Sequence, residues 1–155
     1  MVLEANTKAP QFTAKALVNG REAEISLEDY KGHQVVLYFY PKDMTPGCTT
    51  QAENLRDNFT EFQRRGIIVL GVSPDSIKKH QNFQEKKELP FTLIYDEEKE
   101  LANLYDVWQL KKFMGKEYMG IVRTTYLIDK DGVISHVITK PKVKEHSEEI
   151  LALLE

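Results

Sequence analysis

The sequence predicts an α/β fold in which a central mixed sheet is flanked by helices and preceded by an N-terminal β-hairpin. Two continuous apolar runs, at residues 35–40 and 67–72, are each followed by a segment that leads into a helical pattern. A short loop rich in Asp and Gly joins two further strand-like runs near the C-terminus. The chain has 155 residues, enough for one domain to bury a core without disulfides or metals. We therefore expect a single domain over residues 1–155.

The first part of the chain predicts the hairpin. Residues 12–16 and 23–25 are short alternating runs, and the Asn-Gly pair at 19–20 lies between them. Such a pair between two strand-like runs is a strong local hairpin signal. Residues 26–29 read Ser-Leu-Glu-Asp, which resembles a capping box that opens a single helical turn, and Gly32 is placed to close that turn.

The central part alternates between buried strands and helices. Residues 35–40 read Val-Val-Leu-Tyr-Phe-Tyr, as expected of a strand covered on both faces. From Cys48 onward, apolar residues recur every three or four positions, which predicts a helix running to about residue 65. The run at 67–72 predicts the next strand, and a turn leads into a second helix over about residues 76–88. This order implies a right-handed crossover and a parallel strand pair.

The second half of the chain predicts two antiparallel strands, at 123–128 and 133–138, because the loop between them is short and reads Asp-Lys-Asp-Gly. The other expected segments are a strand at 91–95, a helix at 97–105, an irregular stretch at 106–122 and a C-terminal helix at 144–154. Aromatic and Met side chains within 105–122 are candidates for a pocket rim or a self-association surface, although such residues more often simply pack.

Composition and charge argue against several classes of partner. The formal net charge is −3 and charged residues make up 29% of the chain, so no nucleic-acid footprint is visible. The first eight residues lack the basic start and apolar core of a signal peptide, and no apolar run approaches the ~20 residues that cross a bilayer. A single cysteine fits a reducing compartment. We predict a cytoplasmic protein with no nucleic-acid or membrane partner.

The single cysteine, Cys48, lies where the strand at 35–40 gives way to the predicted helix, directly after Pro46 and Gly47. A lone cysteine on the apolar stripe of a helix is usually an inert, buried thiol. The first turn of a helix favours an anion, however, because its N–H groups are unpaired and the helix dipole is positive there. Lowering the pKa of an ordinary thiol from about 8.5 to about 6 requires roughly 3.4 kcal/mol. A helix end supplies up to about 2 kcal/mol, so a reactive thiolate needs a second positive group.

Three residues outside the helix are candidates to complete such a site, namely Pro41, Thr45 and Arg123. The first two precede the cysteine with the spacing Pro-x-x-x-Thr-x-x-Cys. A proline can shield a thiolate from water, and a threonine hydroxyl can bond the thiolate or a substrate oxygen. Taken alone, Pro41 is equally a strand stop and Thr45 a loop turn. Arg123 begins the strand at 123–128, where ligands gather in open α/β sheets, and is the candidate cation; its alternative role is a solvated strand-end arginine.

The Pro-x-x-x-Thr-x-x-Cys motif after an apolar strand resembles the active-site motif of the peroxiredoxins. The resemblance covers nearly the whole chain and is to the subfamily of peroxiredoxin Q and bacterioferritin comigratory protein. Its further segments are Ala9-Pro10-x-Phe12, Gly71-Val72-Ser73, Tyr105-x-Val107-Trp108, Gly115-Lys116-x-Tyr118-x-Gly120-Ile121-x-Arg123 and Thr125-Tyr126-Leu127-Ile128-Asp129.

The resemblance implies a thioredoxin-like fold and a peroxidase that reduces hydrogen peroxide and organic hydroperoxides. The Cys48 thiolate would attack the O–O bond and become a sulfenic acid. Arg123, the Thr45 hydroxyl and the backbone N–H of Cys48 would stabilise the developing charge. Gly47 and Gln51 are expected on the substrate-binding side, although Gln51 is as easily explained as a surface amide of the helix. No cofactor or metal is implied, and the four histidines are scattered without ligand-like spacing.

Many members of that subfamily carry a resolving cysteine five residues after the first, where this chain has Glu53. With one cysteine an internal disulfide is impossible, so the resemblance implies reduction by an external thiol: thioredoxin, glutaredoxin or a low-molecular-weight thiol. A thiol-based redox sensor or binding protein on the same scaffold is the alternative, because slow reduction would let the oxidised state persist. A third interpretation is a structural domain with an unreactive thiol. The sequence leaves monomer and homodimer both open.

Overall fold

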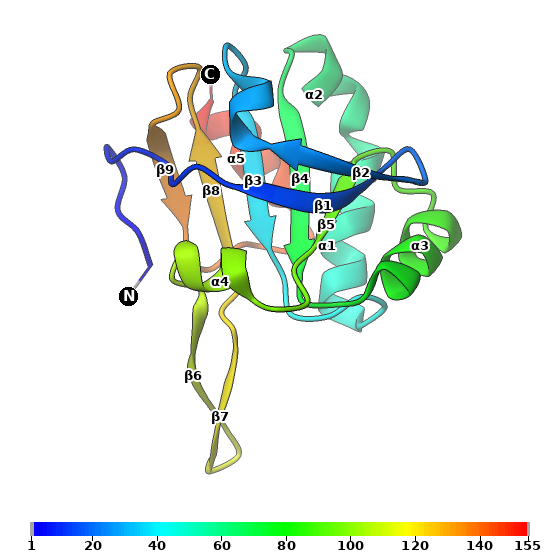
Figure 1. Ribbon diagram of the computed structural model, residues 1–155, viewed down its shortest axis with the longest axis vertical. Helices are drawn as coiled ribbons and strands as arrows, with labels where there is room; N and C mark the ends of the chain where they lie inside the picture. The colour runs from blue at the N-terminus through cyan, green and yellow to red at the C-terminus, as the bar shows by residue number, and fades with distance from the viewer. Residues whose placement is uncertain (1, 155) are drawn as a thin grey trace.

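The computed structural model describes residues 2–154 as an α/β sandwich around a seven-stranded mixed sheet (Figure 1). The strand order in this sheet is β2-β1-β5-β4-β3-β8-β9, and β6 and β7 form a separate two-stranded sheet. The strands are β1 (Thr13–Val18), β2 (Arg21–Ser26), β3 (Val35–Phe39), β4 (Ile68–Ser73), β5 (Thr92–Tyr95), β6 (Trp108–Phe113), β7 (Lys116–Ile121), β8 (Thr124–Ile128) and β9 (Ile134–Ile138).

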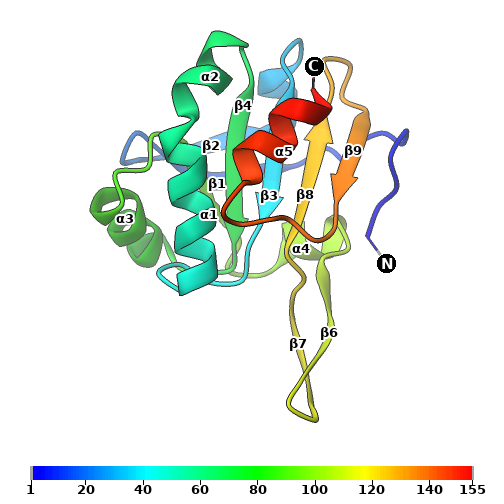
Figure 2. The ribbon, with the colours of Figure 1, turned by 180° about the vertical axis from the view of Figure 1, so that it is seen from behind.

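The helices pack on both faces of the central sheet. They are a short 3-10 helix (Leu27–Tyr30), α1 (Pro46–Asp57), α2 (Phe59–Arg64), α3 (Ile77–Lys86), α4 (Glu100–Leu104) and α5 (His146–Leu153). Figure 2 shows α1, α2 and α5 side by side on one face of the sheet, whereas α4 and the 3-10 helix lie on the face toward the viewer in Figure 1. No helix among residues 2–154 is both long and apolar enough to cross a membrane.

Alternation along β3 divides the buried core into two layers. Val35, Leu37 and Phe39 pack into the cluster on the α4 side of the sheet. Val36 and Tyr38 point the other way, into the cluster that holds residues of α1, α2, α3 and α5. A strand buried on both faces has no polar face to display. This explains the continuous apolar run and confirms its interpretation.

The predicted parallel pair, β3 with β4, and the predicted antiparallel pair, β8 with β9, are both present. The sheet also contains pairings that the sequence did not predict, because β4 is parallel to β5 and β8 lies antiparallel to β3. β1 and β2 form the predicted N-terminal hairpin, with Asn19 at φ 52° and Gly20 at φ 79° in its two-residue turn. Two successive positive φ angles are what the favoured hairpin turn requires. In the predicted capping box, the Ser26 N–H donates to the Asp29 carboxylate at 2.8 Å.

The prediction of one helix from Cys48 to about residue 65 is wrong, because the helix breaks at Asn58 between α1 and α2. The Asn58 side-chain amide donates to the Asn54 carbonyl at 2.8 Å, and the Ser147 hydroxyl donates to the same oxygen at 3.0 Å. Both side chains therefore occupy a carbonyl that a continuing helix would bond through its backbone. The hydrogen bond from Ser147 also joins α1 to the start of α5.

The prediction that 106–122 is irregular is also wrong. This segment forms the antiparallel ribbon β6–β7, closed by a turn at Met114 and Gly115. The ribbon extends away from the body of the protein in both views (Figures 1 and 2). Beyond its base, where Trp108 and Ile121 pack against the core, the ribbon is not covered by the sandwich, so its apolar residues do not follow the alternation that identifies a half-buried strand. Leu110, Phe113 and Met119 are exposed on it.

Candidate active site

The thiol of Cys48 lies in the first turn of α1. Thr45 precedes the helix and Pro46 is its first residue, a position at which the missing proline N–H costs nothing. The first helical hydrogen bond runs from the Thr49 N–H to the Thr45 carbonyl at 2.8 Å. The N–H groups of Gly47 and Cys48 precede that bond, so they have no carbonyl partner within the helix and remain donors toward an anion. Cys48 is 2% exposed, which shields the sulfur from bulk water.

Arg123 brings a positive charge to this sulfur from the connection between β7 and β8. Its Nη2 donates to Cys48 Sγ at 3.2 Å, and its Nη1 donates to Gln51 Oε1 at 2.6 Å. Since Gln51 is neutral, its hydrogen bond orients the guanidinium without cancelling the charge. Arg123 lies one residue before β8 rather than inside it. The structure thus brings together the cysteine and the cation that the sequence separates by 75 positions.

The remaining predicted site residues surround this pair at different distances. Gly47 leaves room for the arginine, because a Cβ atom there would lie 3.3 Å from Arg123 Nη2. Gln51 is fully buried, not a surface amide, and its Nε2 has no partner among the described residues. The Thr45 hydroxyl donates to the Lys42 carbonyl at 2.8 Å, as in a loop turn, and keeps its lone pairs available to a donor. Pro41 is half-buried, two residues after β3.

Two titratable side chains lie behind the thiol and are neutral near pH 7. Burial, then the nearby Asp43 charge and then Cys48, raise the pKa of Tyr38 well above its ordinary value. Burial lowers the pKa of His146. The His146 Nε2 lies 2.9 Å from Thr125 Oγ1, and its Nδ1 lies 2.6 Å from a Glu149 carboxylate oxygen. Arg123 is therefore the only charged side chain that hydrogen-bonds Cys48 among the described residues.

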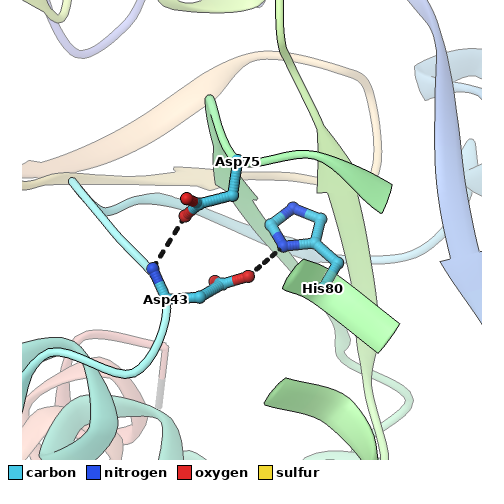
Figure 3. A group of neighbouring side chains, drawn as sticks. All are labelled: Asp43, Asp75 and His80. Carbon is cyan, nitrogen blue, oxygen red and sulfur yellow. Dashed lines mark hydrogen bonds and ion pairs between the residues drawn. The ribbon is translucent and has the colours of Figure 1, made fainter. Parts of the chain in front are cut away.

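The sequence interpretation missed a buried polar cluster that anchors the loop between β3 and α1 (Figure 3). Asp43, in that loop, accepts from the Tyr40 hydroxyl at 2.6 Å and lies 2.5 Å from His80 Nδ1 on α3. Its own N–H donates to the Asp75 carboxylate at 2.7 Å. The acids Asp43 and Asp75 are at most 7% exposed, and His80 is fully buried. The only sequence signal is one acidic residue in each of the loops that follow β3 and β4.

Asp43, Asp75 and His80 also form a donor set of the kind that binds metals, since one ligand atom from each lies within 4.8 Å of the others. Hydrogen bonds already engage both nitrogens of His80, because Nε2 lies 2.8 Å from the Ile94 carbonyl and Nδ1 faces Asp43. Asp75 in turn accepts from the Ser73 hydroxyl at 2.8 Å. The arrangement therefore fits a hydrogen-bonded anchor better than a metal centre, and His80 has a core role.

A thiol at a helix N-terminus, paired with an arginine on a thioredoxin-like sheet, defines a thiol-dependent peroxidase of the peroxiredoxin class. Comparison with known proteins agrees, because the AhpC/TSA family model matches residues 5–137. The chain belongs to the AhpC/TSA family. Peroxiredoxin Bcp of Bacillus subtilis is 51% identical over 155 residues, covering 99% of this chain and 96% of that protein. Peroxiredoxin Bcp of Escherichia coli is 44% identical over 149 residues, covering 96% and 94%.

Solved structures show the same fold. The bacterioferritin comigratory protein of Xanthomonas campestris superposes with a TM-score of 0.88 at 35% identity, covering 97% of both chains. Peroxiredoxin Q of the same organism gives a TM-score of 0.85 at 37% identity, covering 92% of this chain and 89% of that one. These similarities confirm the predicted thioredoxin-like fold and the resemblance to this subfamily.

Proposed function

We propose that Cys48 is the peroxidatic residue of this enzyme, and that Arg123, Thr45, Pro41, Gly47 and Gln51 form its immediate site. The observation that carries the proposal is the 3.2 Å contact between Arg123 Nη2 and Cys48 Sγ at the N-terminus of α1. The helix end and the guanidinium together supply the two positive contributions that a stable thiolate needs. Gln51 fixes the arginine through the hydrogen bond that its Oε1 accepts, and we assign to Pro41 the shielding of the thiolate from water.

In the first step, the thiolate sulfur attacks one oxygen of the hydroperoxide. The S–O bond forms as the O–O bond breaks, so sulfur is oxidised to the sulfenic acid, and the leaving hydroxide or alkoxide takes up a proton to become water or an alcohol. The charge that develops on the two oxygens faces two donors, Arg123 and the N–H of Cys48. The Thr45 hydroxyl, which donates to the Lys42 carbonyl, accepts from the O–H that the hydroperoxide carries. Support for organic substrates comes from the Xanthomonas campestris relative, which reduces alkyl peroxides.

In the second step, a thiol from outside the chain reduces the sulfenic acid. Its sulfur attacks Cys48 Sγ and releases water, leaving a mixed disulfide; a second thiol then attacks the mixed disulfide and frees Cys48, so the two thiols supply two electrons and leave as their own disulfide. An external donor is required because Cys48 is the chain's single cysteine. Thioredoxin, glutaredoxin and small thiols share this chemistry. Such a donor also places the activity in a reducing compartment, and we propose the cytoplasm.

The test compares wild type with Arg123→Met and Cys48→Ser in single-turnover reactions with hydrogen peroxide and with an alkyl hydroperoxide. We expect Arg123→Met to react about 10²-fold more slowly while retaining the wild-type melting temperature, and Cys48→Ser not to react. Mass spectrometry after one equivalent of peroxide should show one added oxygen on Cys48, and this oxygen should disappear on addition of thiol. A wild-type rate no faster than that of free cysteine would overturn the proposal.

A further inference from the structure

Lys111 and Lys112 are neighbours on β6 whose side chains lie on opposite faces of the β6–β7 ribbon. The register pairs Lys111 with Tyr118 and Lys112 with Glu117. Lys112 is an ordinary surface lysine: its side chain is 76% exposed, and its Nζ lies 3.5 Å from Glu117. Lys111 is half-buried, and its Nζ donates to the Ile121 carbonyl at 2.8 Å. Two adjacent lysines therefore have different surroundings.

The Lys111 side chain crosses from β6 to β7 over Gly120. A Cβ atom at Gly120 would lie 3.0 Å from Lys111 Cδ and 3.3 Å from Tyr118 Cε2, so only a glycine leaves this path fully open. The Lys111 ammonium lies 6.0 Å from the centre of the Tyr118 ring, at the outer limit of a cation–π contact. The Lys111 side chain is thus held by its hydrogen bond to the Ile121 carbonyl and by the Tyr118 ring, and Gly120 leaves the space that it occupies.

This ammonium group is bound close to the segment that delivers Arg123 to the thiol. Its acceptor, Ile121, precedes Arg123 by two residues, and the Val122 N–H between them donates to the Val107 carbonyl at 2.8 Å. Burial and the Arg123 charge lower the pKa of Lys111, whereas Cys48 raises it. Lys111 is therefore within electrostatic range of both partners of the Arg123–Cys48 pair.

We propose that Lys111 is a positioning residue of the active site, which fixes the segment carrying Arg123 and adds a second positive charge in the field of Cys48. The proposal rests on the function proposed for Cys48 but concerns a residue outside the active-site motif. It also gives a role to the base of the ribbon, where Trp108 and Ile121 pack against the sandwich core. Lys112, on the other face, has no part in it.

The other titratable groups around Cys48 do not supply this charge. Tyr38 on β3 and His146 on α5 are neutral near pH 7, as described above. Asp43, in the loop before α1, is an acid already bonded to Tyr40 and to His80. Among the groups named here, the cations are the side chains of Arg123, which donates to the sulfur, and Lys111, which donates to the Ile121 carbonyl two residues before Arg123.

The test measures alkylation of Cys48 by iodoacetamide from pH 5 to 9 in wild type, Lys111→Met, Lys111→Arg and Lys112→Met, at low salt and in 1 M salt. We expect Lys111→Met to move the alkylation midpoint up by about half a pH unit at low salt, a roughly threefold loss of thiolate at pH values below the midpoint. Lys111→Arg should restore the midpoint, and Lys112→Met should leave it unchanged. In 1 M salt the Debye length is about 3 Å, so the difference should shrink.

An unchanged midpoint in Lys111→Met would overturn the proposal, as would an equal shift in Lys112→Met. A shift that persists undiminished in 1 M salt would overturn the electrostatic role. Because alkylation requires no peroxide, the result is independent of the proposed function: a wild type inert to peroxide would refute the latter, while the midpoints would still decide the role of Lys111.

Discussion

The position of Arg123 depends on the residue with the smallest side chain in α1. Gly47 stands in the first turn, where a glycine makes the helix less stable than alanine would, by up to about 0.5–1 kcal/mol in a helix interior. A Cβ atom at this position would lie 3.3 Å from Arg123 Nη2, closer than most side-chain contacts. Helix stability therefore favours alanine at position 47, whereas the placement of Arg123 favours the glycine that is present.

This conflict predicts that Gly47→Ala separates stability from activity. The methyl group should displace the guanidinium by a few tenths of an ångström and slow the peroxide reaction about 3- to 10-fold, since small misplacements weaken preorganised charge stabilisation. The melting temperature should stay the same or rise slightly. Glu53→Ala on the same helix is the matched control and should leave the rate unchanged. An unaltered rate in Gly47→Ala, measured by stopped flow, would show that the arginine tolerates the methyl group.

At the scale of elements, the loop between β3 and α1 is held by side chains from three parts of the chain. The Tyr40 hydroxyl, fully buried at the end of β3, donates to Asp43 at 2.6 Å, while His80 contacts the other carboxylate oxygen from α3. The backbone of Asp43 is fixed by Asp75. Since the loop ends at the first residue of α1, this anchor determines where the N-terminus of that helix lies.

We expect Tyr40→Phe to lower the free energy of unfolding by about 1–3 kcal/mol, because it removes one donor from a buried carboxylate. Tyr95→Phe is the matched control, since its hydroxyl contacts Glu22 at 3.3 Å on the surface. That substitution should cost less than about 0.5 kcal/mol. Urea denaturation at pH 7.5 measures both variants. Equal losses would mean that the buried hydrogen bond contributes no more than the exposed one.

The elements that the sequence predicts well are those determined by neighbouring residues. The run at 35–40 is apolar because β3 is buried on both faces, and the Asn-Gly pair at 19–20 directly specifies a turn. The break at Asn58 is different, because Ser147 contributes to it from 89 positions away in the sequence. Helical periodicity carries no information about such a distant partner.

The candidate site divides in the same way. Cys48 and Thr45 belong to one local motif, so their proximity follows from the sequence, whereas Arg123 is predicted from its place at a strand end together with the family resemblance. The contacts between Asp43 and His80, 37 positions apart, depend on how α3 packs and have no local pattern. Lys111 gives no signal of its own either, because Lys112 beside it has the same chemistry and only the register separates them.

At the scale of the whole molecule, α5 connects the end of the chain to the rest of the sandwich. His146, at the start of α5, is fully buried and lies within hydrogen-bond distance of Thr125 on β8 and Glu149 on its own helix. Asn54 of α1 accepts the Ser147 N–H at 2.6 Å. The helix that carries Cys48 and the strand that follows Arg123 are thereby joined through one buried imidazole and its neighbour.

The buried imidazole predicts how the stability of the molecule depends on pH. Burial lowers the pKa of His146 below its ordinary value of 6.5. Between these two pKa values the unfolded state binds a proton that the folded state does not, so stability is fully present above pH 6.5 and decreases as the pH falls. The slope from one such group is at most about 1.4 kcal/mol per pH unit.

We expect His146→Gln to be less stable than wild type at pH 7.5, because its hydrogen bonds are lost, yet to lose less stability on acidification. Between pH 7.5 and 5.5 the wild type should lose up to about 1 kcal/mol more than the variant. Urea denaturation at both pH values measures the free energy of unfolding of each protein. Carboxylates that titrate alike in the two proteins contribute equally to both losses, so their contribution cancels when the losses are compared. His136→Gln on β9 is the control and should follow the wild type. Parallel losses in His146→Gln and wild type would show that His146 does not link the stability of this molecule to pH.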